Sequence, residues 1–520
     1  MRSSPLHTAL LFLGHILSHS ASAGPPDFVT RSGNRLIVEG RPFYFVGTNA
    51  YYLLEEAARG DTQTVTSLFE TSRNLGITVV RTWGFNDSPD SLNPSVIQYR
   101  PGMFKEDALR ALDFVLWQAR QYGIRIILAL VNNWDDYGGM NQYVRWYAAG
   151  QLVSFPLEAA KFSDADLTRI VAGQAGRQYK YAVSHQFGHD DFYSSEVIKG
   201  WYKAYLAMLL RRFNTFTGVQ YRDDPTLFGW ELANEPRSSD RSAMLITGWA
   251  SEMSIYIKGL DQNHLVGTGE EGFDRTTSGY TTGAYSGQSW LFDGTAGASF
   301  TANTSLESID FASIHLYPES WNVTSGAGNV WIRDHIHIAA AISKPLVVGE
   351  FGMRNNKSST YDSWLTTTLL DEGAGALVWQ ILEGARNDPE GFGVRCPDDE
   401  TVCSVLNIQA RYFHSKSVTG FVPVPSRFAL LQNYPNPFNE QTTIRYDLPF
   451  DANAILTVYN TAGQQVATLV DGFQRRGVRK ELFGGRGFAS GAYFVRLVVE
   501  DATTVKRASH TETKRIMLLK

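Results

Sequence analysis

The sequence predicts a (β/α)8 TIM barrel followed by a small all-β, immunoglobulin-like sandwich. Eight short apolar segments alternate with helical stretches between residues 43 and 379, the pattern of repeated β–α units. Each apolar segment ends in polar or aromatic residues, a repetition that a packed core alone does not require. Beyond residue 428, short strands divided by Gly and Asn turns replace the helical pattern.

The barrel elements follow in order after a hairpin at residues 28–42. A helix that starts at 64 ends at Gly76, and one that starts at 105 ends at Gly123, because glycine readily terminates helices. The strands are expected at 43–46, 78–80, 125–131, the start of 227–237, 265–267, 309–314, 346–348 and 376–378. The helices are expected at 64–75, 105–122, 195–216, 245–260, 332–342 and 361–372.

Composition and charge are those of a soluble chain with more than one domain. The 520 residues are 43% hydrophobic and 19% charged, with a net charge of −5. A nucleic-acid partner would favour a basic surface, so none is expected. The 12 Trp residues fit either a large core or a sugar-binding cleft.

The N-terminus has the form of a secretory signal peptide. Arg2 precedes an apolar run, and Ala21-Ser22-Ala23 supplies small residues for cleavage. This run is too short to span a bilayer, and no other stretch is a transmembrane candidate. We expect a signal peptide at 1–23, a barrel domain at 24–420, a linker at 421–428 and a β-sandwich at 429–520.

The chain has two cysteines, Cys396 and Cys403, in a polar segment. Outside the cytoplasm, a disulfide between them is expected. No His or Cys pair completes a metal site with them, so neither a metal nor a cofactor is predicted.

Two glutamates end apolar strands. Glu235 closes the polar end of 227–237, and Glu350 ends the strand within 345–352. In a (β/α)8 barrel the carboxyl ends of the strands form one face, where the chemistry takes place. A lone strand-end Glu would be read as a solvated side chain. Two such residues on one face are the minimal equipment for hydrolysing a glycosidic bond.

Other strand-end residues fit the same chemistry. Arg81 would keep a neighbouring carboxylate ionised, although a surface ion pair is the simpler alternative. Asn234 is suited to hold a sugar 2-hydroxyl, and His315 shares one strand face with Tyr317. Trp379 could form a platform for the sugar, or it could belong to the core.

Six motifs follow one another in the sequence: Gly47-Thr-Asn-Ala-Tyr-Tyr-Leu, Arg81-Thr-Trp, Leu130-Val-Asn-Asn-Trp-Asp-Asp-Tyr-Gly-Gly, Ala233-Asn-Glu-Pro-Arg, His315-Leu-Tyr and Val348-Gly-Glu-Phe-Gly. Together they resemble glycoside hydrolase family 5, and within it the endo-β-1,4-mannanases. The resemblance covers roughly residues 28–415 and implies that Glu235 is the acid/base and Glu350 the nucleophile. Asn-Glu-Pro and Gly-Glu-Phe-Gly alone would indicate only the broader clan of retaining glycosidases.

The resemblance also implies a set of substrate contacts. Arg237 corresponds to a sugar contact on the leaving-group side, and Glu271 to a position in the cleft. Tyr137 is a candidate for a neighbouring subsite. The predicted substrate-binding residues are Arg81, Trp83, Asn132, Trp134, Asn234, Arg237, Glu271, His315, Tyr317 and Trp379.

The C-terminal segment resembles a sorting domain of the type IX secretion system. The resemblance rests on Leu431-Gln-Asn-Tyr-Pro-Asn-Pro-Phe-Asn, Gly491-Ala-Tyr-Phe-Val-Arg-Leu and the closing Lys514-Arg-Ile-Met-Leu-Leu-Lys. It implies export to the outside of the cell, with the secretion machinery as partner. A carbohydrate-binding sandwich is the alternative, and the absence of Trp from this segment disfavours it.

The predicted function is therefore a secreted, monomeric, retaining endo-β-1,4-mannanase acting on mannan, galactomannan and glucomannan. We expect Glu235 to have the higher pKa of the pair, raised by burial and by charged Glu350. Three alternatives stay open: an endo-β-1,4-glucanase, a mannan transglycosylase, and a catalytically silent glycan-binding surface protein.

Overall fold

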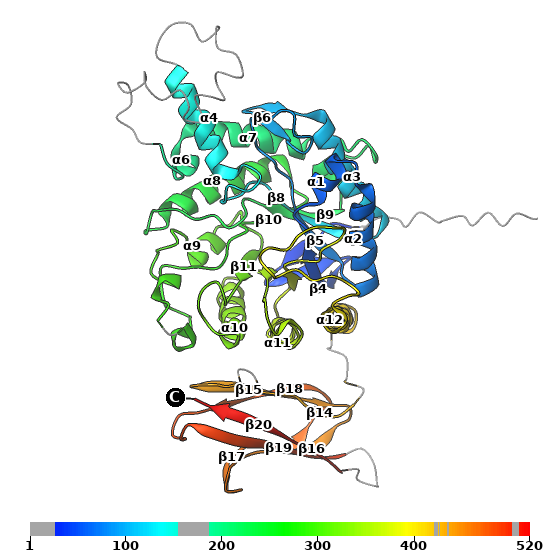
Figure 1. The fold of residues 1–520 in the computed structure, drawn as a ribbon, viewed down its shortest axis with the longest axis vertical. Helices are drawn as coiled ribbons and strands as arrows, with labels where there is room; N and C mark the ends of the chain where they lie inside the picture. The colour runs from blue at the N-terminus through cyan, green and yellow to red at the C-terminus, as the bar shows by residue number, and fades with distance from the viewer. Residues whose placement is uncertain are drawn as a thin grey trace, which may run out of the picture.

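The computed structural model describes residues 27–153, 187–285, 287–420, 425, 427–433, 436–501 and 509–519. The expected signal peptide at 1–23 lies outside the described residues, and so does most of the expected linker at 421–428. Figure 1 shows a barrel surrounded by helices and, next to helices α10, α11 and α12, a separate unit of strands. The predicted fold class is confirmed.

Eight parallel strands form the barrel, and each overlaps its predicted segment. They are hydrogen-bonded in the order β10-β9-β8-β5-β4-β13-β12-β11, and a parallel bridge between Gly267 and Phe311 joins the two ends. A Cβ atom at Gly267 would lie 2.4 Å from the Phe311 ring, so this closure requires glycine. The strands are β4 (Phe45–Asn49), β5 (Val79–Trp83), β8 (Arg125–Ala129), β9 (Leu227–Glu231), β10 (Leu265–Gly267), β11 (Ala312–Leu316), β12 (Leu346–Phe351) and β13 (Gly375–Val378).

The helices pack around this barrel. Helix α2 shows how the sequence sets their limits: Asp61 accepts a hydrogen bond from the Thr64 amide at its start, and Gly76 ends it in the left-handed conformation. The helices are α1 (Leu53–Ala58), α2 (Thr62–Leu75), α3 (Glu106–Gln121), α4 (Gly139–Val153), α6 (Asp191–Ser194), α7 (Glu196–Leu210), α8 (Met244–Leu260), α9 (Phe300–Thr304), α10 (Ser325–Ala341), α11 (Lys357–Leu370) and α12 (Glu400–Thr419).

Several helices differ from the sequence-based expectation: α1, α4, α6 and α9 were not expected, and α10 begins at Ser325 rather than 332. Helix α7 ends at Leu210 rather than 216, because the chain turns there and the Tyr221 amide donates to the Arg212 carbonyl. Helix α12 was not predicted, because its polar residues give a weak amphipathic pattern. It packs against α11 and α2, and it buries Leu406 and Phe413 completely.

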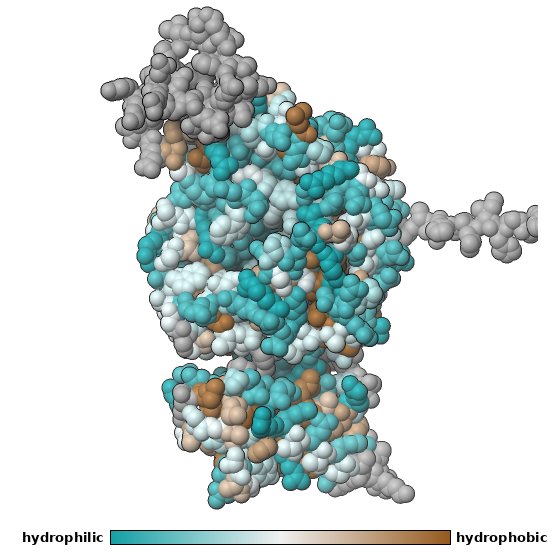
Figure 2. Space-filling model, viewed as in Figure 1, coloured by the Kyte–Doolittle hydropathy of each residue, from teal (hydrophilic) through white to brown (hydrophobic). Residues whose placement is uncertain are grey.

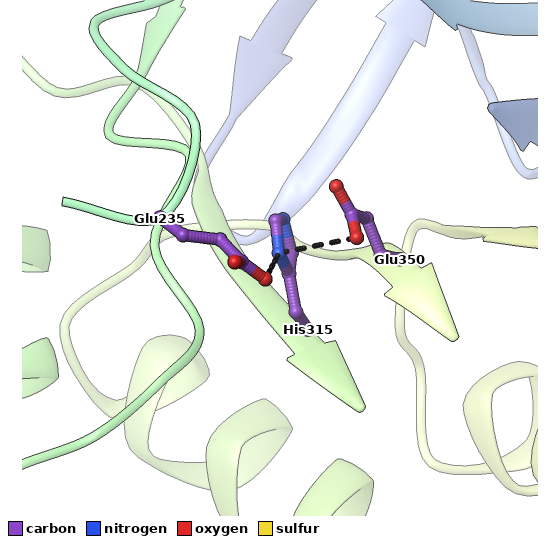
Figure 3. Close-up of side chains that lie close together, drawn as sticks. All are labelled: Glu235, His315 and Glu350. Atoms are coloured by element: carbon purple, nitrogen blue, oxygen red, sulfur yellow. Dashed lines mark hydrogen bonds and ion pairs between the residues drawn. The ribbon is translucent and has the colours of Figure 1, made fainter. Parts of the chain in front are cut away.

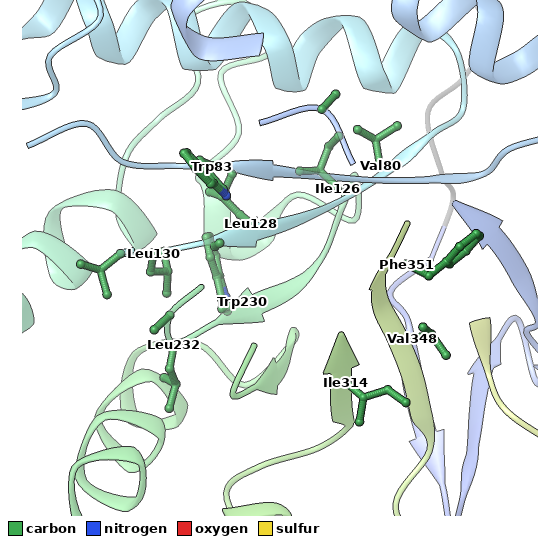
Figure 4. Close-up of a cluster of buried hydrophobic side chains, with 14 of the residues drawn as sticks. Val80, Trp83, Ile126, Leu128, Leu130, Trp230, Leu232, Ile314, Val348 and Phe351 are labelled. Atoms are coloured by element: carbon green, nitrogen blue, oxygen red, sulfur yellow. The ribbon is translucent and has the colours of Figure 1, made fainter. Parts of the chain in front are cut away.

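Hydrophobic side chains fill the barrel on both sides of its wall. Between strands and helices lies a large cluster that includes Val80, Leu128 and Trp230 (Figure 4). Inside, Phe45 and Phe228 belong to a second cluster with residues of the N-terminal hairpin strands. These hairpin strands are β1 (Thr30–Ser32), β2 (Arg35–Val38) and β3 (Arg41–Pro42).

The inner cluster determines which residues reach the opposite end of the barrel. Val79 packs in it, and side chains alternate along a strand, so Arg81 also faces the interior one layer higher. The same spacing carries Asn49 inward from Phe45 on β4. The barrel interior is therefore apolar at one end and polar where the strands finish.

The C-terminal unit is a sandwich of two antiparallel sheets with its own hydrophobic core. The face of this unit seen in Figure 2 carries both hydrophilic and hydrophobic residues. One sheet contains β14 (Ala429–Leu430), β15 (Gln441–Leu448) and β18 (Gly477–Gly484). The other contains β17 (Gln465–Gln474), β16 (Ala452–Asn460), β19 (Gly491–Asp501) and β20 (Ser509–Leu518).

Polar side chains link the sandwich to the barrel helices. Arg445 on β15 donates to Asp362 at 2.8 Å and to Thr366 at 2.9 Å, both on α11. Lys480 on β18 donates to Thr367 at 3.2 Å.

A disulfide joins Cys396 to Cys403 at the start of α12. None of the helices in the described part of the chain combines the length and apolarity needed to cross a bilayer.

Candidate active site

The carboxyl ends of the barrel strands bring four ionisable side chains together. Arg81 lies on β5, His315 on β11 and Glu350 on β12, while Glu235 follows β9. All four are at least nine-tenths buried. Parallel strands of a closed barrel all finish at one rim, so residues far apart in the sequence meet there.

A histidine lies between the two glutamates (Figure 3). His315 Nδ1 is 2.7 Å from Glu235 Oε1 and 3.6 Å from Glu350 Oε2. One oxygen of each carboxylate and this nitrogen all lie within 4.8 Å of one another. This spacing is close to the separation of about 5–5.5 Å typical of retaining glycosidases and well below that of inverting ones.

The backbone at Glu235 is in an unusual conformation that places its carboxylate. Its φ is 53°, in the left-handed region that few residues other than glycine adopt. The Glu235 amide donates to the Gly269 carbonyl at 2.8 Å, which fixes this turn after β9. The carboxylate then accepts hydrogen bonds from His315 and, at 2.6 Å, from the Trp134 indole N–H.

Arg81 spans the barrel interior beneath the two glutamates. Its Nη1 donates to Glu350 Oε1 at 2.6 Å, and its Nη2 donates to Asn234 Oδ1 at 2.8 Å. Its Nε donates to Glu231 Oε2 at 2.6 Å. Arg81 is therefore part of a buried network rather than a surface ion pair.

Tyr317 completes the surroundings of Glu350. Its hydroxyl donates to Glu350 Oε2 at 2.6 Å, so one oxygen of this carboxylate faces Arg81 and the other faces Tyr317. Trp379 stacks on Tyr51 with ring centroids 5.6 Å apart and an 11° angle between the planes. The Trp379 amide donates to the Phe351 carbonyl at 2.8 Å, so this stack lies next to the strand that carries Glu350.

The pKa values of the glutamates differ from the sequence-based expectation, which was that Glu235 would have the higher one. Burial alone would raise the pKa of Glu235, but the hydrogen bond and charge of His315, with the Trp134 N–H and Arg237, hold it below its usual value. Burial raises the pKa of Glu350, and His315 and Arg81 only partly offset this. The expected order of the pKa values was wrong because it considered only burial and the charge of Glu350, which both raise the pKa of Glu235. It left out the hydrogen-bond donors around Glu235, which lower it.

The surroundings of His315 raise its pKa above the usual value. Burial lowers its pKa, but the charge of Glu350 and the hydrogen bond to Glu235 outweigh burial, so the net pKa is raised. Its Nδ1 lies 2.7 Å from Glu235 Oε1, and with the hydrogen on Nδ1 it donates to this carboxylate.

A second cluster lies beside Glu235. Arg237 forms two hydrogen bonds to Glu271, at 2.6 and 2.7 Å. Its guanidinium carbon lies 5.2 Å from the Trp134 ring centroid and 4.9 Å from that of Phe273. Trp134 is 42% exposed and is the member of this cluster most open to solvent.

Two of the predicted substrate contacts, Trp83 and Asn132, are buried. Trp83 is 6% exposed and packs against Phe85, with ring centroids 5.1 Å apart. Asn132 is fully buried, and its Oδ1 accepts a hydrogen bond from Asn234 Nδ2 at 3.1 Å. Both predictions followed the strand-end pattern, which cannot distinguish a side chain in the site from one that supports it. Tyr137 likewise bonds Glu55 through its hydroxyl.

The site also contains residues that the sequence did not single out. Asn49 Oδ1 accepts from Arg81 at 3.1 Å, while Asn49 Nδ2 donates to the Gly349 carbonyl at 2.9 Å. Glu231 is the last residue of β9, within the segment that contains Glu235. A polar residue that ends an otherwise apolar strand was the signal that could have revealed both.

Among the described residues, Glu235, His315 and Glu350 form the one group whose spacing could hold a metal ion. Their facing atoms are already engaged, since His315 donates to Glu235, while Arg81 and Tyr317 donate to Glu350. A cation at this point would also lie close to the Arg81 guanidinium. The donor set therefore fits a pair of carboxylates working with protons better than a metal centre.

Comparisons with known proteins agree with this geometry. Residues 26–394 match the family model for GH family 5 beta-mannosidase-like proteins, and residues 432–509 match a secretion system C-terminal sorting domain. Mannan endo-1,4-beta-mannosidase 2 of Oryza sativa subsp. japonica is 35% identical over 400 residues, which cover 72% of this chain and 82% of that protein.

Solved structures of endo-mannanases are also similar to this chain. The hyperthermostable endo-1,4-beta-D-mannanase of Thermotoga petrophila superposes with a TM-score of 0.61 at 33% identity, covering 71% of this chain and 99% of its own. The endo-1,4-beta-mannanase of Rhizomucor miehei also gives 0.61 at 33% identity, covering 75% and 100%.

Proposed function

Because this chain belongs to the GH family 5 beta-mannosidase-like family, we propose that Glu350 and Glu235 hydrolyse internal β-1,4-mannosidic bonds by double displacement. The chain is a glycoside hydrolase of the mannan endo-1,4-β-mannosidase class. One observation supports the mechanism above all: the two carboxylates are held within 4.8 Å of each other with His315 between them. That separation leaves room for direct attack on the sugar rather than for an intervening water.

In the first step, Glu350 attacks the anomeric carbon while the leaving oxygen takes a proton from Glu235. Arg81 and Tyr317 keep Glu350 ionised and hold both of its oxygens in place. The proton reaches Glu235 from His315 Nδ1, 2.7 Å away, as the leaving oxygen docks. The bond to the leaving sugar breaks as the bond to Glu350 forms.

In the second step, a water molecule replaces the departed sugar. Glu235, now a carboxylate, takes a proton from this water, and the resulting hydroxide attacks the anomeric carbon. The bond to Glu350 breaks and releases a sugar with its original anomeric configuration. The proton taken from water returns Glu235 and His315 to their starting state.

Substrate contacts follow from the donors that remain free. Asn234 Nδ2 carries two hydrogens, and one donates to Asn132, which leaves the other for a sugar 2-hydroxyl. Trp379 forms the platform at the cleavage point, backed by Tyr51. Arg237, fixed by Glu271, binds sugar on the leaving-group side. Mannan, galactomannan and glucomannan all contain β-1,4-linked mannose in their backbones, so all three are proposed substrates.

The C-terminal sorting domain makes this a secreted protein. Its partners are β-mannan and the secretion machinery, and the catalytic chain acts as a monomer. A signal peptide at 1–23 directs export, residues 24–420 carry the enzyme, and a linker at 421–428 precedes the sorting domain at 429–520.

Release of reducing ends from β-mannan and from carboxymethyl cellulose tests this proposal. Wild type is compared with Glu350→Ala and Glu235→Ala, and with Glu307→Ala as a control at an exposed glutamate outside the site. The expected result is cleavage of mannan by wild type and control, and none by the two active-site variants.

Other outcomes identify the alternatives. Cleavage of the cellulose derivative alone would make the enzyme an endo-β-1,4-glucanase. Long transfer products at high oligosaccharide concentration would indicate a mannan transglycosylase. Binding to mannan without any new reducing ends would support a silent glycan-binding surface protein.

A further inference from the structure

A third glutamate lies inside the barrel beneath the two proposed catalytic ones. Glu231 is the last residue of β9, and its side chain is fully buried. Its Oε2 accepts a hydrogen bond from Arg81 Nε at 2.6 Å. Its Oε1 has no hydrogen-bond partner in the described part of the chain.

Structural stability alone explains this residue poorly. A buried carboxylate loses its hydration, and the attraction of one partner seldom offsets this cost when an oxygen is left unbonded. Arg81 is the only cation paired with Glu231 among the described residues, and it also pairs with Glu350. A neutral side chain would avoid the cost and still leave Arg81 an ion partner.

The contacts of Arg81 show what Glu231 contributes. A guanidinium group is planar, so fixing the direction of Nε also fixes both terminal nitrogens. With Nε held by Glu231, Nη1 lies 2.6 Å from Glu350 Oε1 and Nη2 lies 2.8 Å from Asn234 Oδ1. One anchoring bond therefore orients the proposed nucleophile and the proposed sugar contact.

We propose that Glu231 is a positioning residue that aligns Arg81 and shares its positive charge, so that Glu350 stays reactive as a nucleophile. This inference rests on the proposed function of Glu350. Arg81 lowers the pKa of Glu350 through its charge. Because Glu231 draws part of that charge to itself, Glu350 remains more basic than beside an arginine with no second anion.

Replacing Glu231 with glutamine tests the charge while keeping the shape. The full charge of Arg81 then acts on Glu350 and lowers its pKa, so the acid limb of the kcat/KM profile moves to lower pH. A less basic carboxylate is a weaker nucleophile, so kcat falls by about tenfold or more. KM changes little, because Glu231 is fully buried. The other titratable groups facing Glu350 are unchanged: His315, Glu235 and Tyr317.

A matched control comes from another fully buried carboxylate that pairs with an arginine. Asp113 on α3 bonds Arg212 at 2.8 and 2.7 Å, away from the strand ends. Asp113→Asn removes the same kind of charge, so it is expected to lower the unfolding temperature without moving the acid limb. A shift of that limb in Glu231→Gln alone therefore reports positioning rather than general loss of stability.

The assay uses the full chain and manno-oligosaccharides, with thermal unfolding measured in parallel. A wild-type acid limb and wild-type kcat in Glu231→Gln would overturn the proposal. If that variant does not fold, Glu231→Asp provides the test: it keeps the charge but shortens the anchor, so kcat should fall while the acid limb stays in place. Wild-type kcat in Glu231→Asp would then contradict the proposal. An inactive wild type would instead reject the proposed function itself.

Discussion

Each proposed catalytic carboxylate receives one hydrogen bond from an aromatic side chain, and removing these bonds should move opposite limbs of the pH–rate profile. The Tyr317 hydroxyl donates to Glu350 Oε2 at 2.6 Å, and the Trp134 N–H donates to Glu235 Oε2 at 2.6 Å. Phenylalanine retains the aromatic ring at either position but has no donor. The two variants therefore serve as controls for each other.

Tyr317→Phe acts on the acid limb. Glu350 must be ionised to attack, so activity is lost as the pH falls through its pKa, which burial already raises. Tyr317 lowers that pKa, and its loss raises it further. A buried hydrogen bond to a charged group is worth about 1.5–3 kcal/mol, and one pKa unit is about 1.4 kcal/mol. Because Tyr317 is partly exposed, water can replace part of the lost hydrogen bond. We therefore expect the acid limb to move upward by about one pH unit.

Trp134→Phe acts on the alkaline limb. Glu235 and His315 must hold a proton between them, so activity is lost as the pH rises past the point where the pair releases it. The Trp134 N–H stabilises ionised Glu235, so without it the pair keeps its proton to higher pH. Trp134 is 42% exposed, and solvent screening reduces the expected upward shift to about half a unit.

The measurement is kcat/KM on manno-oligosaccharides between pH 4 and pH 9, fitted to two ionisations. We expect the acid limb to move in Tyr317→Phe alone and the alkaline limb to move in Trp134→Phe alone. Exchange of the two effects would reverse the assignment of nucleophile and acid/base. Unchanged limbs in both variants would refute the reasoning from the hydrogen bonds.

Three further predictions concern the nucleophile, the disulfide and the sandwich. Glu350→Ala should lower kcat by about 10⁴-fold or more, and azide should restore turnover with an α-mannosyl azide product; recovery as a β-azide would argue against a nucleophile on this face. Replacing both cysteines, Cys396→Ser with Cys403→Ser, should lower the unfolding free energy by about 2.5 kcal/mol for a loop of this length. A denaturant midpoint equal to that of wild type would contradict a stabilising role of the disulfide. Arg445→Ala, which loses the bond to Asp362, should speed proteolytic release of the sandwich and leave mannan cleavage unchanged. Proteolytic release at the same rate from the variant and from wild type would contradict the docking contact.

The barrel could be predicted because apolar strand segments and helical segments alternate regularly along the sequence. Each is a short apolar run bounded by breakers, and the strand ends carry polar residues such as Glu235 and Glu350. The sandwich strands were equally visible as short alternating runs. Helix α12 was missed, because residues 400–419 mix polar and apolar side chains with little periodicity. Its place is set by packing against α2 and α11, which no local pattern reveals.

The site could be predicted only where residues stand at strand ends. Arg81, Glu235, His315 and Glu350 meet there because parallel strands finish together. Burial was not predictable in the same way: Asn132 occupies such a position, and it is fully buried and accepts a hydrogen bond from Asn234. The order of the pKa values also depends on donors that come from other strands and loops, and only the folded chain brings them together.

The anomeric configuration of the first product tests the central claim most directly. Proton NMR during cleavage of a manno-oligosaccharide shows which anomer appears before mutarotation mixes the two forms. Carboxylates within 4.8 Å of each other predict that the β-anomer forms first, with the configuration of the bond retained. Initial appearance of the α-anomer would mean inversion by a water molecule, and it would contradict the assignment of Glu350 as a covalent nucleophile.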